Sequence, residues 1–295
     1  MKPGSKTLVY VYLSVFLGTV CGGAGFVFMK DALDAFSIAW FIFLRFFITI
    51  LVLFPLLRKE LTPTAVIPIL RDAVIVGTLF FIATMIQSAG IAKIGAGKSA
   101  FINSMSVVLI PAIQAVLVWH LPSPRVMVGC ILCMSGVAAL SGVSPSGFSG
   151  GRGEIEVFVG TCIFAVGMFF TKHAANHGNP RLFSFVMFAV ITVWSLPFAA
   201  AGGLPSDIGP RAVIGVLYTA LLMNIAMIMV NNHSLKYISP TSLAVMQSTM
   251  AVHGAFFGFL LRDEVITLNF VLCGLAVISG ILIVLSDYGR VKPRP

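Results

Sequence analysis

The chain has 295 residues, of which 58% are hydrophobic and only 10% are charged, and its mean hydropathy is +1.03. This composition excludes an ordinary water-soluble domain and indicates a membrane protein. Ten spans of about 20 residues use roughly 200 residues, which leaves no room for a soluble catalytic domain. The net charge of +9 does not indicate a nucleic-acid partner, because the basic residues are scattered over loops.

Hydropathy predicts ten transmembrane helices, five in each half of the chain. The first five cover residues 7–29, 36–57, 73–92, 100–119 and 125–143. A linker rich in Gly, Ser and Pro, SPSGFSGGRGE, follows. The second five cover residues 155–171, 183–201, 212–230, 243–261 and 267–285.

The second half repeats the first, with residues 1–146 predicted as one five-helix repeat and residues 147–295 as the other. An odd number of crossings per half requires the two copies to be inverted in the bilayer. The predicted fold is therefore an all-α membrane protein, in which ten transmembrane helices form two inverted five-helix repeats around a central cavity.

Alignment of AKIGAGKSAFINSMSVVLIP with LKYISPTSLAVMQSTMAVHG places Lys93 on Lys236 and Pro111 on Gly254. Proline removes a backbone donor and glycine weakens a helix, so Pro111 and Gly254 are predicted hinges at equivalent places. Ordinary helix packing is the alternative, because both residue types are frequent in spanning helices.

The distribution of Lys and Arg predicts that both termini are cytoplasmic. With that orientation, twelve of the 19 Lys and Arg lie on the inner side, six lie on the outer side, and Arg45 lies within a span. Basic residues accumulate in cytoplasmic loops, so this arrangement is favoured, and we expect a multi-pass protein of the cell (inner) membrane. The six outer residues are Lys30, Lys93, Lys98, Arg152, Arg211 and Arg262.

Arg45 is the formal charge deepest within a predicted span. At about 1.5 Å per residue it lies about 14 Å into a hydrocarbon core about 30 Å thick. A cation there costs at least ~2.5 kcal/mol unless it is paired or hydrated. Two interpretations stay open. In the structural one, the guanidinium bonds to helix carbonyls or snorkels to an interface; in the functional one, it attracts a substrate carboxylate or phosphate.

Other polar and aromatic side chains within spans are candidate cavity residues, with bonding between neighbouring helices as the alternative for each. No acidic residue lies well inside a predicted span, which favours a neutral or zwitterionic cargo over an organic cation. The polar candidates are Thr84, Gln87, Asn103, Ser104, Gln114, Asn224, Gln247 and His253. The aromatic candidates, which could stack on cargo, are Trp40, Phe80 and Tyr218.

Neither a metal nor a cofactor is predicted. His173 and His177 lie four residues apart and could share a metal ion, yet no clear third ligand accompanies them. Cys130 and Cys133 have the spacing of a metal or redox pair, but no second pair is present, so packing is the favoured interpretation.

The sequence resembles the EamA-type members of the drug/metabolite transporter superfamily. The resemblance rests on FIFLRFF around Arg45, AKIGAGKSAFINSMSVVLIP, LKYISPTSLAVMQSTMAV and LLRDEVITLNFVLCGLAVISGILIVL. The family tends to carry a Glu before the last span of each half, which Glu264 supplies, whereas the first half has His120 and Leu121 there. The resemblance implies a ten-helix basket whose central cavity opens alternately to the two sides, and export of small metabolites such as amino acids.

We therefore predict a secondary transporter that exports amino acids or similar metabolites by alternating access. The expected partners are a zwitterionic small molecule and the lipid bilayer, without nucleic acid, and the expected state is a monomer or weak oligomer. Three alternatives stay open: an exporter of another metabolite class, a channel, and an intramembrane metal-dependent enzyme that uses His173, His177 or His253.

Overall fold

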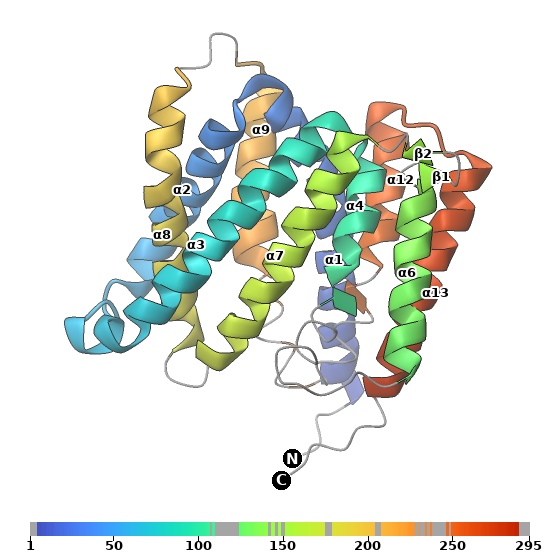
Figure 1. The fold of residues 1–295 in the computed structure, drawn as a ribbon. Helices are drawn as coiled ribbons and strands as arrows, with labels where there is room; N and C mark the ends of the chain where they lie inside the picture. Colours follow the sequence, from blue (N-terminus) through green and yellow to red (C-terminus); the bar gives the residue numbers. More distant parts are fainter. Residues whose placement is uncertain are drawn as a thin grey trace.

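Helices account for nearly all of the chain that the computed structural model describes (Figure 1). It describes residues 5–288 except 107, 110–123, 141–142, 145–146, 149–150, 175–178, 204–207, 228–229, 231–233, 235–236, 238–245 and 248. The first half forms α1 (Ser5–Ala35), α2 (Ile38–Leu57), α3 (Pro63–Lys93), α4 (Ala96–Ser104) and α6 (Pro124–Leu140). The second half forms α7 (Arg152–Ala174), α8 (Pro180–Ala201), α9 (Pro210–Tyr218), the π-helix η2 (Thr219–Ala226), α12 (Met250–Arg262) and α13 (Leu268–Tyr288).

Corresponding helices of the two halves run in opposite directions. Figure 1 shows α1 rising from the end of the bundle that holds both termini, whereas α7 descends toward that end. The pairs α2 with α8 and α6 with α13 are antiparallel in the same way. Two short strands, β1 (Val143–Ser144) and β2 (Gly147–Phe148), pair at the opposite end, which is called the distal end below. The predicted all-α, inverted-repeat membrane fold is confirmed.

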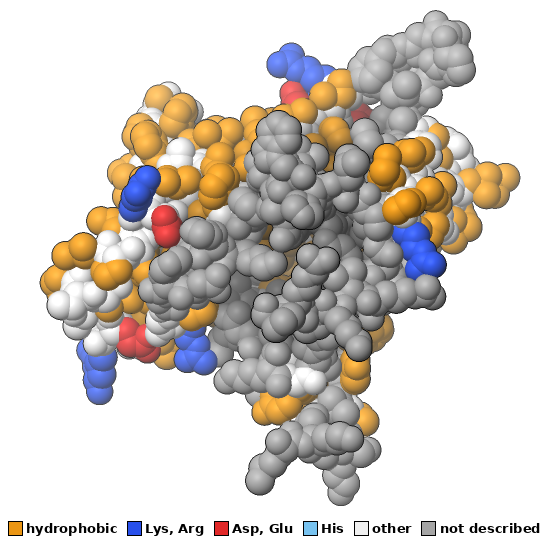
Figure 2. Space-filling model, turned by 60° about the horizontal axis from the view of Figure 1, so that its bottom comes forward, with side chains coloured by type: hydrophobic (Ala, Val, Ile, Leu, Met, Phe, Trp, Pro, Cys, Tyr) orange, Lys and Arg blue, Asp and Glu red, His pale blue; other side chains and the backbone are white. Residues whose placement is uncertain are grey.

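Helix length and surface composition both fit a lipid environment. Among the described residues, four helices are long and apolar enough to cross a membrane, within α1, α2, α3 and α8. Many large apolar side chains are exposed, among them Ile67, Ile131 and Val193. Figure 2 shows hydrophobic side chains over the described flanks of the bundle, with only scattered charged ones. Such a surface is stable where lipid tails replace water.

Helix boundaries follow from local capping groups. The side chain of Ser37 accepts the backbone N–H of Trp40 at the start of α2, and Asn179 accepts that of Arg181 at the start of α8. The C-terminal end of α3 is capped by another element, because Lys30 of α1 donates to three of its last carbonyls, at 2.7 to 3.2 Å.

Several predicted spans differ from the observed helices, and the third and the eighth show why. The third predicted span starts at residue 73, but α3 begins at Pro63, because the charges of Arg71 and Asp72 interrupt the apolar run without interrupting the helix. The eighth predicted span, 212–230, starts as α9 and continues as the π-helix η2. Hydropathy measures burial in lipid and carries no signal for a change of helical hydrogen bonding.

Gly254 lies at a close contact between helices. A Cβ atom added to it would lie 2.4 Å from Cβ of Ala100 on α4 and 3.6 Å from the carbonyl oxygen of Gly23 on α1. The glycine therefore permits α12 to approach both helices of the first half. Its role as a hinge stays a prediction, and its proposed counterpart Pro111 lies outside the described residues.

We expect Gly254→Ala to reduce stability, because the new methyl group must displace α4 or α12. Overpacking of this kind costs about 1–3 kcal/mol. The measurement is the thermal melting temperature of the protein in detergent. Gly209→Ala is the matched control, because an added Cβ there meets nothing within 4 Å. Equal melting temperatures for the two variants would contradict the close contact.

Candidate functional site

Arg45 is held by a chain of polar side chains that links α2 to η2. Its Nη2 donates to Oδ1 of Asn224 at 2.7 Å. Nδ2 of Asn224 donates to Oγ1 of Thr49 at 3.1 Å, and Thr49 donates to the carbonyl oxygen of Arg45 at 2.8 Å. The cation deepest in the predicted spans is thus fixed by neutral groups from both halves of the chain.

The charge of Arg45 has no acidic partner in the part of the chain that the structure describes. Its guanidinium carbon lies 6.0 Å from the ring centre of Phe41 and 5.4 Å from that of Phe46. The Nε atom is buried and has no hydrogen-bond partner among the described residues. Aromatic faces offset only part of the cost of a buried cation, so the guanidinium retains donors and charge for an anion.

The π-helix positions Asn224 for this contact. Asn224 lies in η2, is 6% exposed, and reaches across to α2 from the second half. Segments of π-helix are rare and are frequently found at functional sites. Asn224 was predicted as a cavity residue, whereas Thr49 was not; its spacing of four residues from Arg45 was the available signal.

A second polar cluster joins α3, α4 and α7. Nε2 of Gln87 donates to Oδ1 of Asn103 at 2.8 Å and to Oγ1 of Thr161 at 3.3 Å. Gln87 and Asn103 were predicted, whereas Thr161 of α7 was not. Within the described residues, Oε1 of Gln87 and Nδ2 of Asn103 have no hydrogen-bond partner, so each retains the capacity to bind a polar ligand group.

Two of the predicted aromatic residues pack between helices. The Phe80 ring stacks on Phe164 of α7 with centroids 4.8 Å apart, and it is 8% exposed. Tyr218 stacks on Phe28 at 4.1 Å, and its hydroxyl donates to the carbonyl oxygen of Cys21 at 2.8 Å. These contacts hold α7 against α3 and α9 against α1, which is a structural role for both residues.

Trp40 and Ser104 lie away from the Arg45 contact. The indole Nε1 of Trp40 donates to the carbonyl oxygen of Gly203 at 2.6 Å, near the start of α2 at the distal end. Ser104 is buried and bonds to the carbonyl oxygen of Phe101, one turn earlier in the chain. Neither bond involves the Arg45 or Gln87 clusters.

The remaining candidates are half-buried or lie outside the described part of the chain. Thr84 lies on α3 about one turn before Gln87, and Gln247 lies just before α12. His253 of α12 meets the Phe16 ring edge-on at 5.4 Å, and its Nδ1 is buried without a described partner. Gln114 falls outside the described residues.

The structure offers no described metal site. No group of three His, Cys, Asp or Glu side chains in the described ranges is arranged to hold a metal ion. The side chains of His173 and His177 lie outside those ranges. The metal-dependent alternative therefore gains no support from the described residues.

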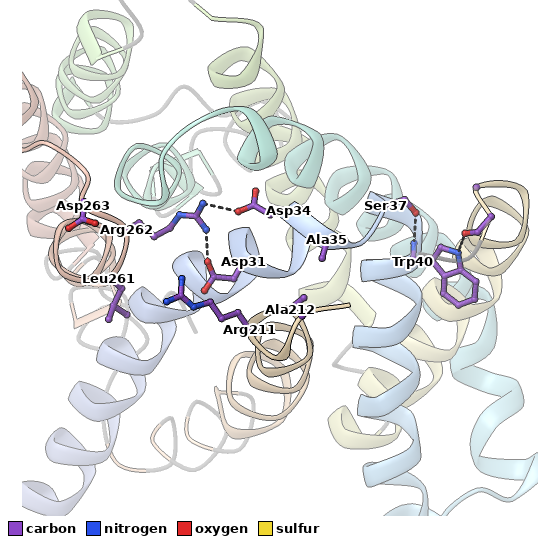
Figure 3. Close-up of a pocket in the computed structure, with 13 residues that line it drawn as sticks. Asp31, Asp34, Ala35, Ser37, Trp40, Arg211, Ala212, Leu261, Arg262 and Asp263 are labelled. Atoms are coloured by element: carbon purple, nitrogen blue, oxygen red, sulfur yellow. Dashed lines mark hydrogen bonds and ion pairs between the residues drawn. The ribbon is translucent and has the colours of Figure 1, made fainter. Parts of the chain in front are cut away.

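The distal end carries a charged cavity of about 800 Å³ (Figure 3). Asp31 and Asp34 of α1, Trp40, Arg211 and Arg262 are among the residues that line it. The guanidinium of Arg262 lies between the two aspartates and donates to both. Arg262 lies just after the predicted ninth span. Burial alone would lower its pKa, but the hydrogen bonds and negative charges of the two aspartates have the larger effect, so the pKa of Arg262 is raised.

The fold and the polar interior together define a multi-pass α-helical membrane protein with a basic side chain between its helices. The sequence profile of the EamA-like transporter family matches residues 9–142 and again residues 151–286. The chain therefore belongs to the EamA-like transporter family and is a membrane transporter.

Two further similarities agree with this assignment. An "Uncharacterized transporter" of Archaeoglobus fulgidus is 27% identical over 264 residues, which cover 90% of this chain and 82% of that protein. A chain from a solved crystal structure shares the fold with a TM-score of 0.66 and 11% identity, over 96% of this chain and 99% of the other.

We expect Asn224→Leu to destabilise the protein, because it removes one partner from Arg45 and one from Thr49. Leaving buried polar groups unsatisfied costs about 1–3 kcal/mol. Thermal melting in detergent measures the loss. Asn269→Leu serves as the control, because it removes an exposed amide near the start of α13 whose described contact is a weak bond from the Cys273 thiol at 3.5 Å. A melting temperature equal to that of the control would show that the contact contributes nothing.

Proposed function

We propose that the protein is a secondary transporter that exports small zwitterionic metabolites, with amino acids as the principal class. In this proposal the two inverted repeats move relative to each other, and the binding site opens alternately to the two sides. The observation that carries the proposal is the half-buried cation of Arg45, which has only neutral partners among the described residues and whose Nε is buried without a partner there.

The chemistry of Arg45 supports recognition of a carboxylate. A guanidinium presents five N–H donors in a planar fork that matches a carboxylate in a bidentate manner. Asn224 occupies one nitrogen, so the group is oriented without being neutralised. In a site of low dielectric constant, an arriving carboxylate gains more from this charge than it would in water.

The rest of a zwitterionic cargo requires acceptor groups for its ammonium. The acidic side chains that form ion pairs lie at the distal end, on Asp31, Asp34, Glu154 and Glu156. Amide oxygens, such as those of Gln87 and Asn103, therefore supply the acceptors in this proposal. They bind a positive group without the permanent negative charge that would favour organic cations.

The proposed orientation places both termini in the cytoplasm and the distal end outside. It follows from the excess of Lys and Arg in the loops on the terminal side. Substrate would therefore leave the cytoplasm past Arg45 and exit at the distal end.

We expect purified protein in liposomes to catalyse counterflow of amino acids that saturates with substrate and needs no ATP. A carrier has a finite number of sites, whereas leakage or a channel gives flux that rises linearly. The triple variant His173→Ala, His177→Ala, His253→Ala should keep this flux. Its loss together with a bound metal would favour the intramembrane enzyme.

Arg45→Gln should raise the KM for amino acids roughly 10-fold or more, since a hydrogen bond to a charged group contributes about 1.5–3 kcal/mol. Amino-acid amides, which lack the carboxylate, should be affected far less. The measurement is counterflow of both substrates in the same liposomes. Arg45→Lys, which keeps the charge but loses the fork, is the intermediate control.

Equal losses for amino acids and their amides would assign Arg45 a structural role and remove the carboxylate proposal.

A further inference from the structure

Arg262 ties the end of α12 to the end of α1 at the distal end. Its Nη1 donates to Asp31, and its Nη2 donates to Oδ2 of Asp34 at 2.8 Å. The two aspartates lie about one helical turn apart on the first repeat, whereas Arg262 belongs to the second (Figure 3). The Arg262 side chain is 22% exposed, so water reaches these pairs.

Glu264, two residues later, ties the same segment to α4. Its carboxylate accepts the backbone N–H groups of Ala96, at 2.5 Å, and of Gly97, at 3.0 Å. These groups belong to the first turn of α4, where the helix has unpaired donors and a partial positive charge. An anionic side chain of the second repeat thus caps a helix of the first.

Asp263 separates these two contacts. It ends α12 in the left-handed conformation, with φ of 53°, so the chain turns sharply between Arg262 and Glu264. The turn lets adjacent opposite charges reach different helices of the other repeat. Space for the Glu264 carboxylate depends on Gly258, because an added Cβ there would lie 2.7 Å from Oε2.

Other ion pairs at this end also cross between the repeats. Lys93 pairs with Glu156 at 2.5 Å, and Lys98 pairs with Glu154 at 3.3 Å. The pair of Arg152 with Glu156 lies within α7 and joins nothing across the repeats. Every ion pair between described residues lies at the distal end, and all of them except the pair of Arg152 with Glu156 join the two repeats.

We propose that residues 262–264 form the distal gate of the transporter: Arg262 holds α1, Glu264 holds α4, and both must release for this end to open. This gate rests on the alternating access proposed above. The Arg262 pairs suit such a role because water reaches them, so water can replace each partner and the contact can reform in every cycle. Release of one charged segment would free two helices of the opposite repeat together.

The first test measures opening without measuring transport. Ser99 lies on α4, is fully buried, and follows the residues that Glu264 caps. Ser99→Cys therefore serves as the reporter, and its thiol is labelled with a water-soluble maleimide. Adding Arg262→Gln and Glu264→Gln should raise the labelling rate about 10-fold, because the maleimide reacts only with molecules whose distal end is open. Labelling of native cysteines, measured without the reporter, is subtracted.

Arg152→Gln in the same reporter is the matched control, because it removes a distal ion pair that does not cross the repeats. Its labelling rate should match that of the unmodified reporter. An unchanged rate in the Arg262, Glu264 double variant, at an unchanged melting temperature, overturns the gate. So does an equal increase in the control.

The second test locks the gate. Asp34→Cys with Arg262→Cys, joined by a reducible bis-methanethiosulfonate, should lose most counterflow and regain it after reduction. The single variants should not respond to the reagent. Unchanged flux in protein shown by mass spectrometry to be linked overturns the gate but leaves the transporter proposal standing. If no variant shows flux and the unmodified protein shows none either, the proposed function is contradicted. In that case the maleimide labelling experiment alone tests the gate.

Discussion

Among the described residues, the polar interior of this protein is organised around the guanidinium of Arg45, which has no acidic partner there. A cation at mid-span costs several kcal/mol in lipid, so Arg45 requires polar neighbours, and the chain supplies Asn224 and Thr49. Asn224 comes from the other half of the sequence, and a π-helical segment brings it into reach. The contact that makes the charge tolerable therefore also joins the two repeats, and it leaves charge available for an anion.

At the distal end, charged side chains are stabilised in a different way from Arg45. There, cations and carboxylates pair directly, because access to water makes the pairs inexpensive to form and to break. At mid-span no such pair is present among the described residues. This division separates a mid-span region, where the proposed zwitterionic cargo would meet an unpaired cation, from a region whose charges satisfy each other. A carrier needs both kinds of region, because a site whose charge is already neutralised by the protein does not attract a charged group of the cargo.

Helix α4 connects these regions in the structure. Its first turn is capped by Glu264, its middle packs on Gly254 through Ala100, and its end carries Asn103 in the Gln87 cluster. Each of the three contacts depends on a different part of the chain. A displacement of α4 would therefore alter the distal end and the polar interior together.

The sequence by itself determined the membrane environment, the helical spans, the inversion of the halves and the position of Arg45 within a span, because burial in lipid acts on each span separately. It did not determine the start of α3, the π-helix, or the roles of Thr49 and Thr161. Hydropathy does not tell whether charged residues at a span end belong to the helix, nor which partner a polar residue inside a span contacts. Only the tertiary structure decided which groups meet. Arg45 with Asn224, and Arg262 with Asp31, are pairs far apart in the chain, and their contacts arise from packing of the repeats against each other.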